Sequence, residues 1–141
     1  MGGGHEVELQ ELRIMNNELR IKTFTDLNTW KEAHKFVLII YGLTKGFPKD
    51  KLFALVSQIR RASVSITSNI AKGFSRDSYI DKKHFYVMAH GSLTEVQNQL
   101  IISKDVQYID EATYQTSFSQ SVGIHKLLSG LIKATKERIK S

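Results

Sequence analysis

What most constrains this chain is the spacing of its apolar residues, which recur every three or four positions through four long segments with few helix breakers between them. Pro48 is the only proline. Residues three and four apart lie on one face of an α-helix, because the helix has about 3.6 residues per turn. No segment alternates apolar and polar residues for long. The sequence therefore predicts an all-α protein, folded as an antiparallel up-down four-helix bundle that oligomerises.

The boundaries of the helices follow from residues that start or stop them. The expected helices cover about residues 28–45, 50–72, 78–105 and 111–139. Gly46 and Pro48 should end the first helix, and Gly73 should stop the second, because glycine suits a helix C-cap. Asp110 should cap the fourth. Gly91 lies inside the third helix, where it predicts a close contact with a neighbouring helix.

Each helix has one apolar face that should turn toward the core. In the first helix this face consists of Leu27, Trp30, His34, Val37, Leu38 and Tyr41. In the second it consists of Leu52, Leu55, Val56, Ile59, Ala62, Ile66 and Ile70. In the third it consists of Phe85, Met88, Ala89, Ser92, Val96 and Leu100. In the fourth it consists of Tyr114, Phe118, Ser121, His125, Leu128, Ile132, Thr135 and Ile139. Further apolar residues of the fourth helix, Ile124, Leu127 and Leu131, indicate either subunit contacts or a broader core.

The first part of the chain differs from the rest. Residues 1–24 are short of periodic apolar residues and are interpreted as an N-terminal extension, partly helical or disordered, before a bundle domain at 25–141. Three consecutive glycines follow the first Met, and Met15 could be an internal start. We therefore leave residues 1–14 out of the functional interpretation.

Positive charge is concentrated in one stretch. The chain has 20 Lys and Arg against 14 Asp and Glu, a net charge of +6. Residues 45–83 alone hold nine bases and three acids, which is also a net +6. Such a stretch indicates either a surface for nucleic acid or a solvated basic surface. The candidate phosphate-binding residues are Lys45, Lys49, Lys51, Arg60, Arg61, Lys72, Arg76, Lys82 and Lys83.

Several catalytic and cofactor motifs are missing from the sequence. It has no phosphate-binding glycine loop, no dinucleotide fingerprint and no cysteine. Asp81-x-x-His84 occurs once, whereas di-iron bundles need a carboxylate–histidine pair of this spacing twice. His34 and His125 fall on apolar faces and are interpreted as core residues satisfied by a hydrogen bond. We expect a non-enzymatic protein with no cofactor and no metal, cytoplasmic, and without a membrane-spanning segment.

A set of short strings, taken in order and spacing, resembles one family. The strings are Phe24–Leu27, Trp30 with Ala33 and His34, Phe47–Pro48, Gln58–Ala62, Ser65–Ile66, Ser68–Ala71, Gly73–Phe74, Ala89 with Gly91–Leu93 and Glu95, and Tyr108–Ile109. The chain is similar over these residues to the four-helix-bundle family of 23S rRNA intervening-sequence proteins. It departs from the family pattern at Lys72, where glutamate is usual, and at Thr67, where proline is usual.

The resemblance implies more than a fold. It implies a ring-like homopentamer, and a relationship to the accessory protein of diversity-generating retroelements, a basic pentameric barrel that works with a reverse transcriptase and nucleic acid. For most members the molecular function is unknown. The expected partners are thus copies of the same chain, RNA or DNA, and a nucleic-acid-processing protein.

Two functions follow from these observations. The first is a basic oligomer that binds nucleic acid electrostatically with little sequence specificity. The alternative is a protein-interaction scaffold with no nucleic-acid role, in which Arg60, Arg61, Ser65 and Asn69 serve subunit packing. Arg60 and Arg61 point about 100° apart on their helix, so at most one of them can face the core.

Overall fold

The computed structural model describes residues 21–49 and 54–141, and every regular element in these two ranges is helical. A short 3-10 helix, η1 (Phe24–Asp26), precedes the bundle. The bundle helices are α2 (Asn28–Thr44), α3 (Leu55–Phe74), α4 (Tyr79–Asp105) and α5 (Glu111–Lys140). The predicted all-α class and the four bundle helices are confirmed. The proposed start at Met15 and residues 1–14 lie outside the described residues.

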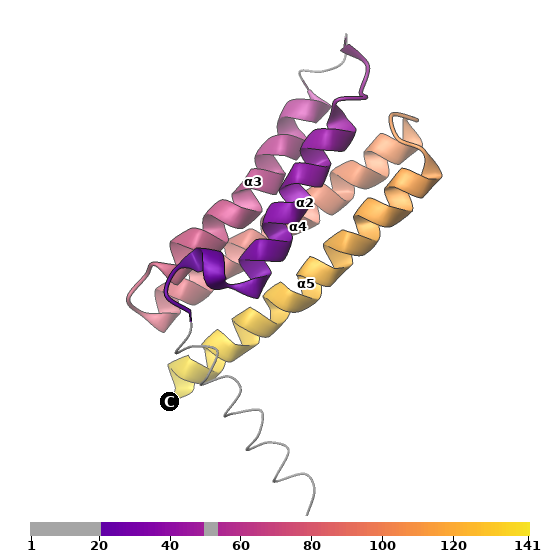
Figure 1. The fold of residues 1–141 in the computed structure, drawn as a ribbon. Helices are drawn as coiled ribbons and strands as arrows, with labels where there is room; N and C mark the ends of the chain where they lie inside the picture. Colours follow the sequence, from indigo (N-terminus) through magenta and orange to yellow (C-terminus); the bar gives the residue numbers. More distant parts are fainter. Residues whose placement is uncertain (1–20, 50–53) are drawn as a thin grey trace, which may run out of the picture.

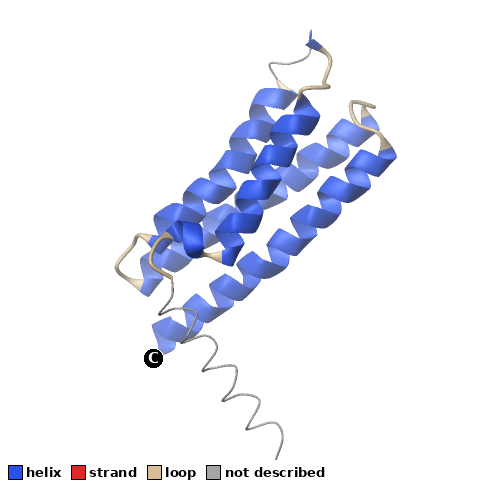
Figure 2. Ribbon diagram, viewed as in Figure 1, coloured by secondary structure: helices blue, strands red, loops and turns tan. Residues whose placement is uncertain are grey.

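The four helices run alternately up and down, and each lies beside the next in sequence (Figure 1). α2 and α5 also pack together, which closes the bundle. Figure 2 shows that loops are confined to the two ends. We call one the terminal end, because Ile21, the α3–α4 turn and the last turns of α5 meet there. At the opposite end, Phe47, which follows α2, packs on Tyr108, which lies between α4 and α5, with ring centroids 5.3 Å apart.

The helix ends follow the expected capping residues with one exception. Asp110 accepts a hydrogen bond from the Thr113 backbone N–H at 2.7 Å, as predicted for the start of α5. Ser78 likewise accepts from the Asp81 backbone N–H at 3.1 Å at the start of α4. Gly73 does not stop α3, which continues to Phe74. A Cβ at Gly73 would lie 2.6 Å from the Tyr86 ring, so this glycine permits close packing of α4 on α3.

The buried face of α2 agrees with the predicted one only in part: Leu27 and Val37 are buried and Trp30 packs against the core, as predicted. The face that packs inward consists of Thr29, Ala33, Phe36, Val37, Ile40 and Thr44. Of the predicted face, His34 is exposed, Leu38 is 59% exposed and Tyr41 is 37% exposed. Apolar residues cover more than one side of α2, so the spacing fits two faces equally well. Only the packing against α3 and α5 decides between them.

The inner face of α4 also agrees only in part: Ala89, Val96 and Leu100 are buried as predicted, whereas Phe85, Met88 and Ser92 are not. Tyr86 and Leu93 are buried together with Ala89, Val96 and Leu100. Met88 is 45% exposed. Gly91 is exposed, and a Cβ placed there would meet no atom within 4 Å, so the close contact predicted at Gly91 is wrong within this chain.

Small polar residues form hydrogen bonds between the helices. The Ser65 and Ser92 hydroxyls are 2.8 Å apart across the α3–α4 contact, and Asn69 Nδ2 donates to the Ser65 hydroxyl at 3.0 Å. Between α4 and α5, Gln97 Nε2 donates to the Ser121 hydroxyl at 3.0 Å. These bonds let polar groups be buried at little cost and specify which helix faces meet. None of the described helices is apolar over a length that could cross a bilayer.

Candidate nucleic-acid interface

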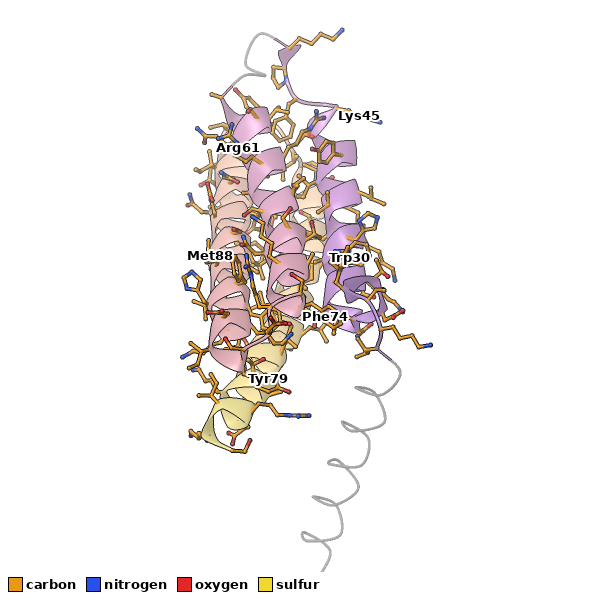
Figure 3. The ribbon with its side chains drawn as sticks, turned by 90° about the vertical axis from the view of Figure 1, so that its left-hand side faces the viewer. Trp30, Lys45, Arg61, Phe74, Tyr79 and Met88 are labelled. Atoms are coloured by element: carbon orange, nitrogen blue, oxygen red, sulfur yellow. The ribbon has the colours of Figure 1, made fainter. Side chains whose placement is uncertain are left out.

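The predicted basic residues do not form one site, because α3 separates them. Lys45, Lys49, Arg60 and Arg61 lie toward the opposite end of the bundle, and Lys72, Arg76, Lys82 and Lys83 lie toward the terminal end. Figure 3 shows this separation, with Lys45 and Arg61 toward one end and Phe74 and Tyr79 at the other. Along α3, Arg61 and Lys72 are separated by roughly 16 Å at 1.5 Å per residue. Lys51 lies outside the described residues.

At the opposite end, Arg60 serves the fold. Its Nε donates to the buried Thr44 hydroxyl at 2.9 Å, and its guanidinium lies 4.7 Å from the centre of the Tyr41 ring. Arg61, one position further, is exposed, as the angular offset between neighbouring helix positions requires. Lys45 and Lys49 are also exposed. Of the predicted residues at this end, Lys45, Lys49 and Arg61 are therefore accessible to a ligand. Arg60 instead links α3 to α2.

At the terminal end, Lys82 also has a structural role. Its ammonium donates to the Phe74 carbonyl at 2.6 Å, at the C-terminus of α3, where helix carbonyls lack partners within the helix. Burial lowers the pKa of Lys82, and the charge of Asp77 opposes this shift. Lys82 thus ties α4 to the last carbonyls of α3. Its replacement would test the fold as well as any binding.

The other predicted residues at this end are more accessible. Lys72 and Arg76 are exposed, and the Arg76 guanidinium lies 4.5 Å from the centre of the Phe85 ring. Lys83 is half-buried in the first turns of α4. These three side chains lie around the α3–α4 turn, which places them at one end of the molecule.

The structure adds basic residues that the sequence analysis missed. Lys126, Lys133, Lys136 and Lys140 follow one another on α5 at steps of seven, three and four, so they share one side of that helix. Lys133 and Lys136 line a groove of about 320 Å³ between α4 and α5, together with Val87, His90, Ser129 and Ile132. The spacing of these lysines was visible in the sequence. The densest run of charge, at residues 45–83, lies elsewhere, and the stripe on α5 is spread over fifteen residues.

Positive charge exceeds negative charge at the terminal end. In the described residues at the C-terminal part of α3, the α3–α4 turn, the start of α4 and the C-terminal part of α5, the bases are Lys72, Arg76, Lys82, Lys83, Lys133, Lys136, Arg138 and Lys140, and the acids are Asp77, Asp81 and Glu137. Eight bases less three acids leave a net +5. The described residues form two ion pairs with one another, Lys35–Glu32 and Lys104–Asp105, and neither involves the lysines of this region. The convergence of three helix ends thus produces a strongly positive region.

A cavity of about 250 Å³ opens within this region. Its walls include Leu27, Phe74 and Leu131, and its polar groups include Tyr79, Lys82, Tyr86 and Arg138. Burial raises the pKa of Tyr86 to about 12, so its phenol stays protonated. The Arg138 guanidinium donates to the Tyr79 hydroxyl at 3.4 Å and lies 5.7 Å from the centre of that ring.

Two histidines meet in the α4–α5 contact. His90 Nε2 and His125 Nε2 are 2.7 Å apart, and their rings are inclined at 59°. Burial lowers the pKa of His90, and the neighbouring His125 lowers it further. The prediction that His125 is satisfied by a hydrogen bond is confirmed. The same prediction for His34 is wrong, because His34 is exposed and stacks on Trp30 with centroids 4.8 Å apart.

Comparisons with known proteins agree on the kind of bundle. The family described as 23S rRNA-intervening sequence protein matches residues 25–130. A crystal structure from Bacteroides thetaiotaomicron VPI-5482, of a protein with unknown function from the S23 ribosomal protein family, is similar with 26% sequence identity and a TM-score of 0.70. The similarity covers 74% of this chain and 98% of that one. No curated protein matches the chain.

Proposed function

Because the chain belongs to the family of 23S rRNA-intervening sequence proteins, we propose that it is a non-enzymatic, homo-oligomeric helical bundle that binds RNA or DNA through the phosphate backbone. The family description does not state a molecular activity. The argument for nucleic acid therefore rests on the charges of this chain and their arrangement.

The observation that carries the proposal is the positive terminal end with the groove that adjoins it. Lys72, Arg76 and Lys83 lie around the α3–α4 turn, and Lys133 and Lys136 lie along the α4–α5 groove. Exposed lysine ammoniums are suited to phosphates, which they neutralise while releasing condensed counterions. A row of them on a helix face follows a phosphate backbone without reading bases. Binding of this kind discriminates little between sequences.

Assembly into a ring would bring several copies of this positive region together. Large apolar side chains are exposed mainly on α2 and α4, including Leu38 and Ile39 of α2 and Val87, Met88 and Ile102 of α4. An open groove of about 430 Å³ lies between α2 and α5, lined by Ile39, Leu43, Ala112, Thr113, Thr116 and Ser117. Faces of this kind are typical of contacts between subunits. We include five copies in the proposal, as the family resemblance implies.

Salt dependence of binding tests the proposal. Each phosphate neutralised on duplex DNA contributes about −0.9 to the slope of log affinity against log salt concentration. Five contacts would weaken binding roughly 500-fold between 50 and 200 mM salt. The measurement is a fluorescence-anisotropy titration of single- and double-stranded RNA and DNA at several salt concentrations.

A matched pair of variants locates the surface. Replacing Lys72, Lys133 and Lys136 together by Glu should abolish binding at 200 mM salt, because all three lie at or near the terminal end. The control replaces Lys45, Lys49 and Arg61 by Glu, which makes the same change in net charge at the opposite end and should retain most of the binding. Equal losses in both variants would argue against a localised surface. Lys82 is left intact because it caps α3.

The same titration distinguishes nucleic-acid binding from the alternative function. If the wild-type protein binds no RNA or DNA at 50 mM salt, the nucleic-acid proposal fails. The exposed apolar faces of α2 and α4 then favour a protein-interaction scaffold, whose partner would be sought among nucleic-acid-processing proteins.

A further inference from the structure

The contact between His90 and His125 has a chemistry that phosphate binding does not use. The two residues come from different helices, α4 and α5, and the helical backbone holds both. Their Nε2 atoms are the atoms that approach most closely, at 2.7 Å. Both rings are half-buried, and His90 also lines the α4–α5 groove, which opens to solvent. A small ion therefore has a route to the pair.

The distance between the two nitrogens is close to that of two imidazoles on one metal ion. Metal–nitrogen bonds are about 2.0–2.1 Å long for Zn²⁺. At angles between a right angle and the tetrahedral angle, two such bonds separate the nitrogens by roughly 2.9–3.4 Å. The observed 2.7 Å would have to open by a few tenths of an ångström. Small rotations of the two side chains provide that change without moving the helices.

We propose that His90 and His125 are the two protein ligands of a site for a divalent transition-metal ion of the Zn²⁺, Ni²⁺ and Cu²⁺ group. Imidazole suits these ions, whereas Mg²⁺ and Ca²⁺ prefer oxygen ligands. In the metal-free state one imidazole donates its Nε2 proton to the other, and metal binding replaces that shared hydrogen bond. The ligand form is the neutral imidazole with its proton on Nδ1, so the ring that donates its Nε2 proton must change to this tautomer before its Nε2 lone pair can bind the metal.

The site is open on the groove side. No group of three or more His, Cys, Asp or Glu that could hold a metal occurs in the described residues, so water completes the coordination. Lys133 and Lys136 line the same groove. Their exposed ammoniums repel a cation weakly through water, and they favour an anion such as phosphate at an open coordination position. An open site of this kind exchanges its metal readily, unlike a closed structural site.

A variant that retains only this pair gives the sharpest test. The chain has histidines at 5, 34, 84, 90 and 125. Replacing His5, His34 and His84 by Gln leaves His90 and His125 as the sole imidazoles. At pH 7.5 and without nucleic acid, calorimetric titration should show one Zn²⁺ bound per chain by this triple variant, with an affinity equal to that of the corresponding wild-type site.

Single replacements then assign the ligands. His90→Gln and His125→Gln, each made in the triple variant, should weaken Zn²⁺ binding by about tenfold or more, since losing even a residue that only orients a ligand costs that much. His84→Gln alone in the wild type is the control and should leave binding unchanged. Failure of the triple variant to bind Zn²⁺, Ni²⁺ or Cu²⁺ at 1 mM, or full binding by either single replacement, would overturn the proposal.

A second measurement covers the case in which a single replacement does not fold. In proton NMR spectra of the triple variant, Zn²⁺ should shift the ring signals of both histidines together. A shift of one ring only, or of neither, contradicts a shared site. Because no nucleic acid is present, these results stand whether or not the proposed phosphate surface exists.

Discussion

At the scale of single residues, Gly73 controls how closely α3 and α4 approach. Replacing it by Ala would place a Cβ 2.6 Å and 2.8 Å from two carbon atoms of the Tyr86 ring, which is buried and cannot move freely. We expect Gly73→Ala to lower the free energy of unfolding by about 1–3 kcal/mol, the usual cost of overpacking. Urea unfolding followed by circular dichroism measures it.

Gly91 is the matched control for Gly73. It lies inside α4, but a Cβ there would meet no atom within 4 Å, so Gly91→Ala should stabilise the protein by up to about 1 kcal/mol. If Gly91→Ala destabilised the protein as Gly73→Ala does, Gly91 would have to be covered by another copy of the chain. A stable Gly73→Ala variant would contradict the packing described for Tyr86.

Arg60 has a structural role, whereas its neighbour Arg61 is accessible to a ligand. Arg60 is half-buried and bonded to Thr44, whereas Arg61 is exposed. We expect Arg60→Ala to lower the free energy of unfolding by about 1.5–3 kcal/mol, as for hydrogen bonds to charged groups. Arg61→Ala should change it by less than about 0.5 kcal/mol. Equal effects in thermal unfolding would mean that the Thr44 contact contributes nothing.

At the scale of elements, the start of α5 depends on pH through its capping residue. Hydrogen bonds from the Thr113 hydroxyl and from its backbone N–H hold the pKa of Asp110 below its ordinary value of 3.8. A carboxyl whose pKa is lower in the folded state stabilises the fold above its unfolded pKa. That contribution disappears as the pH falls through the folded pKa.

The variant Asp110→Asn isolates this effect, because asparagine caps a helix without titrating. The wild type should melt at a higher temperature than Asp110→Asn at pH 6, and the difference should shrink as the pH is lowered toward 2.5. Glu137→Gln, a change of an exposed acid in the same helix, is the control and should show a smaller change with pH. A difference independent of pH would show that the charge of Asp110 does not matter.

How much of each element could be predicted depended on how many of its sides are apolar. The buried residues Val56, Ile59, Ala62, Ile66 and Ile70 of α3 were predicted correctly, because the other sides of α3 are largely polar. α2 and α4 carry apolar residues on two sides, and the spacing alone cannot tell which side meets a neighbour of the same chain. Membership of the core is a property of packing between helices, which a single helix pattern does not contain.

The candidate site was predicted less well for a related reason. Sequence shows where charge is dense, and this found Lys72, Arg76 and Lys83. It does not show which side of α5 faces α4, and this orientation places Lys133 and Lys136 in the α4–α5 groove. Nor does it show that Arg60 and Lys82 have partners inside the protein. Such contacts between residues distant in sequence arise only when the chain is folded.

At the scale of the whole molecule, the exposed apolar side chains of α2 and α4 predict assembly. Leu38 is 59% exposed and Val87 is 47% exposed, although both are large and apolar. For five copies, the number that the family resemblance implies, light scattering at micromolar concentration should give about five times the chain mass of 16.1 kDa, roughly 80 kDa. Replacing Leu38 and Met88 by Glu should dissociate the assembly while the helical signal is retained. A wild-type mass near that of one chain would contradict the prediction.

The position of Ile21 relative to the end of α5 has a consequence for connectivity. Ile21 lines the same cavity as Leu131 and Arg138 of α5, so the bundle begins and finishes at one end (Figure 1). A short flexible linker could therefore join the last residue to Ile21, with new ends opened in the turn between α4 and α5. Such a circular permutant would retain every helix contact in a different order along the chain. The native order is thus one of several that the same three-dimensional arrangement allows.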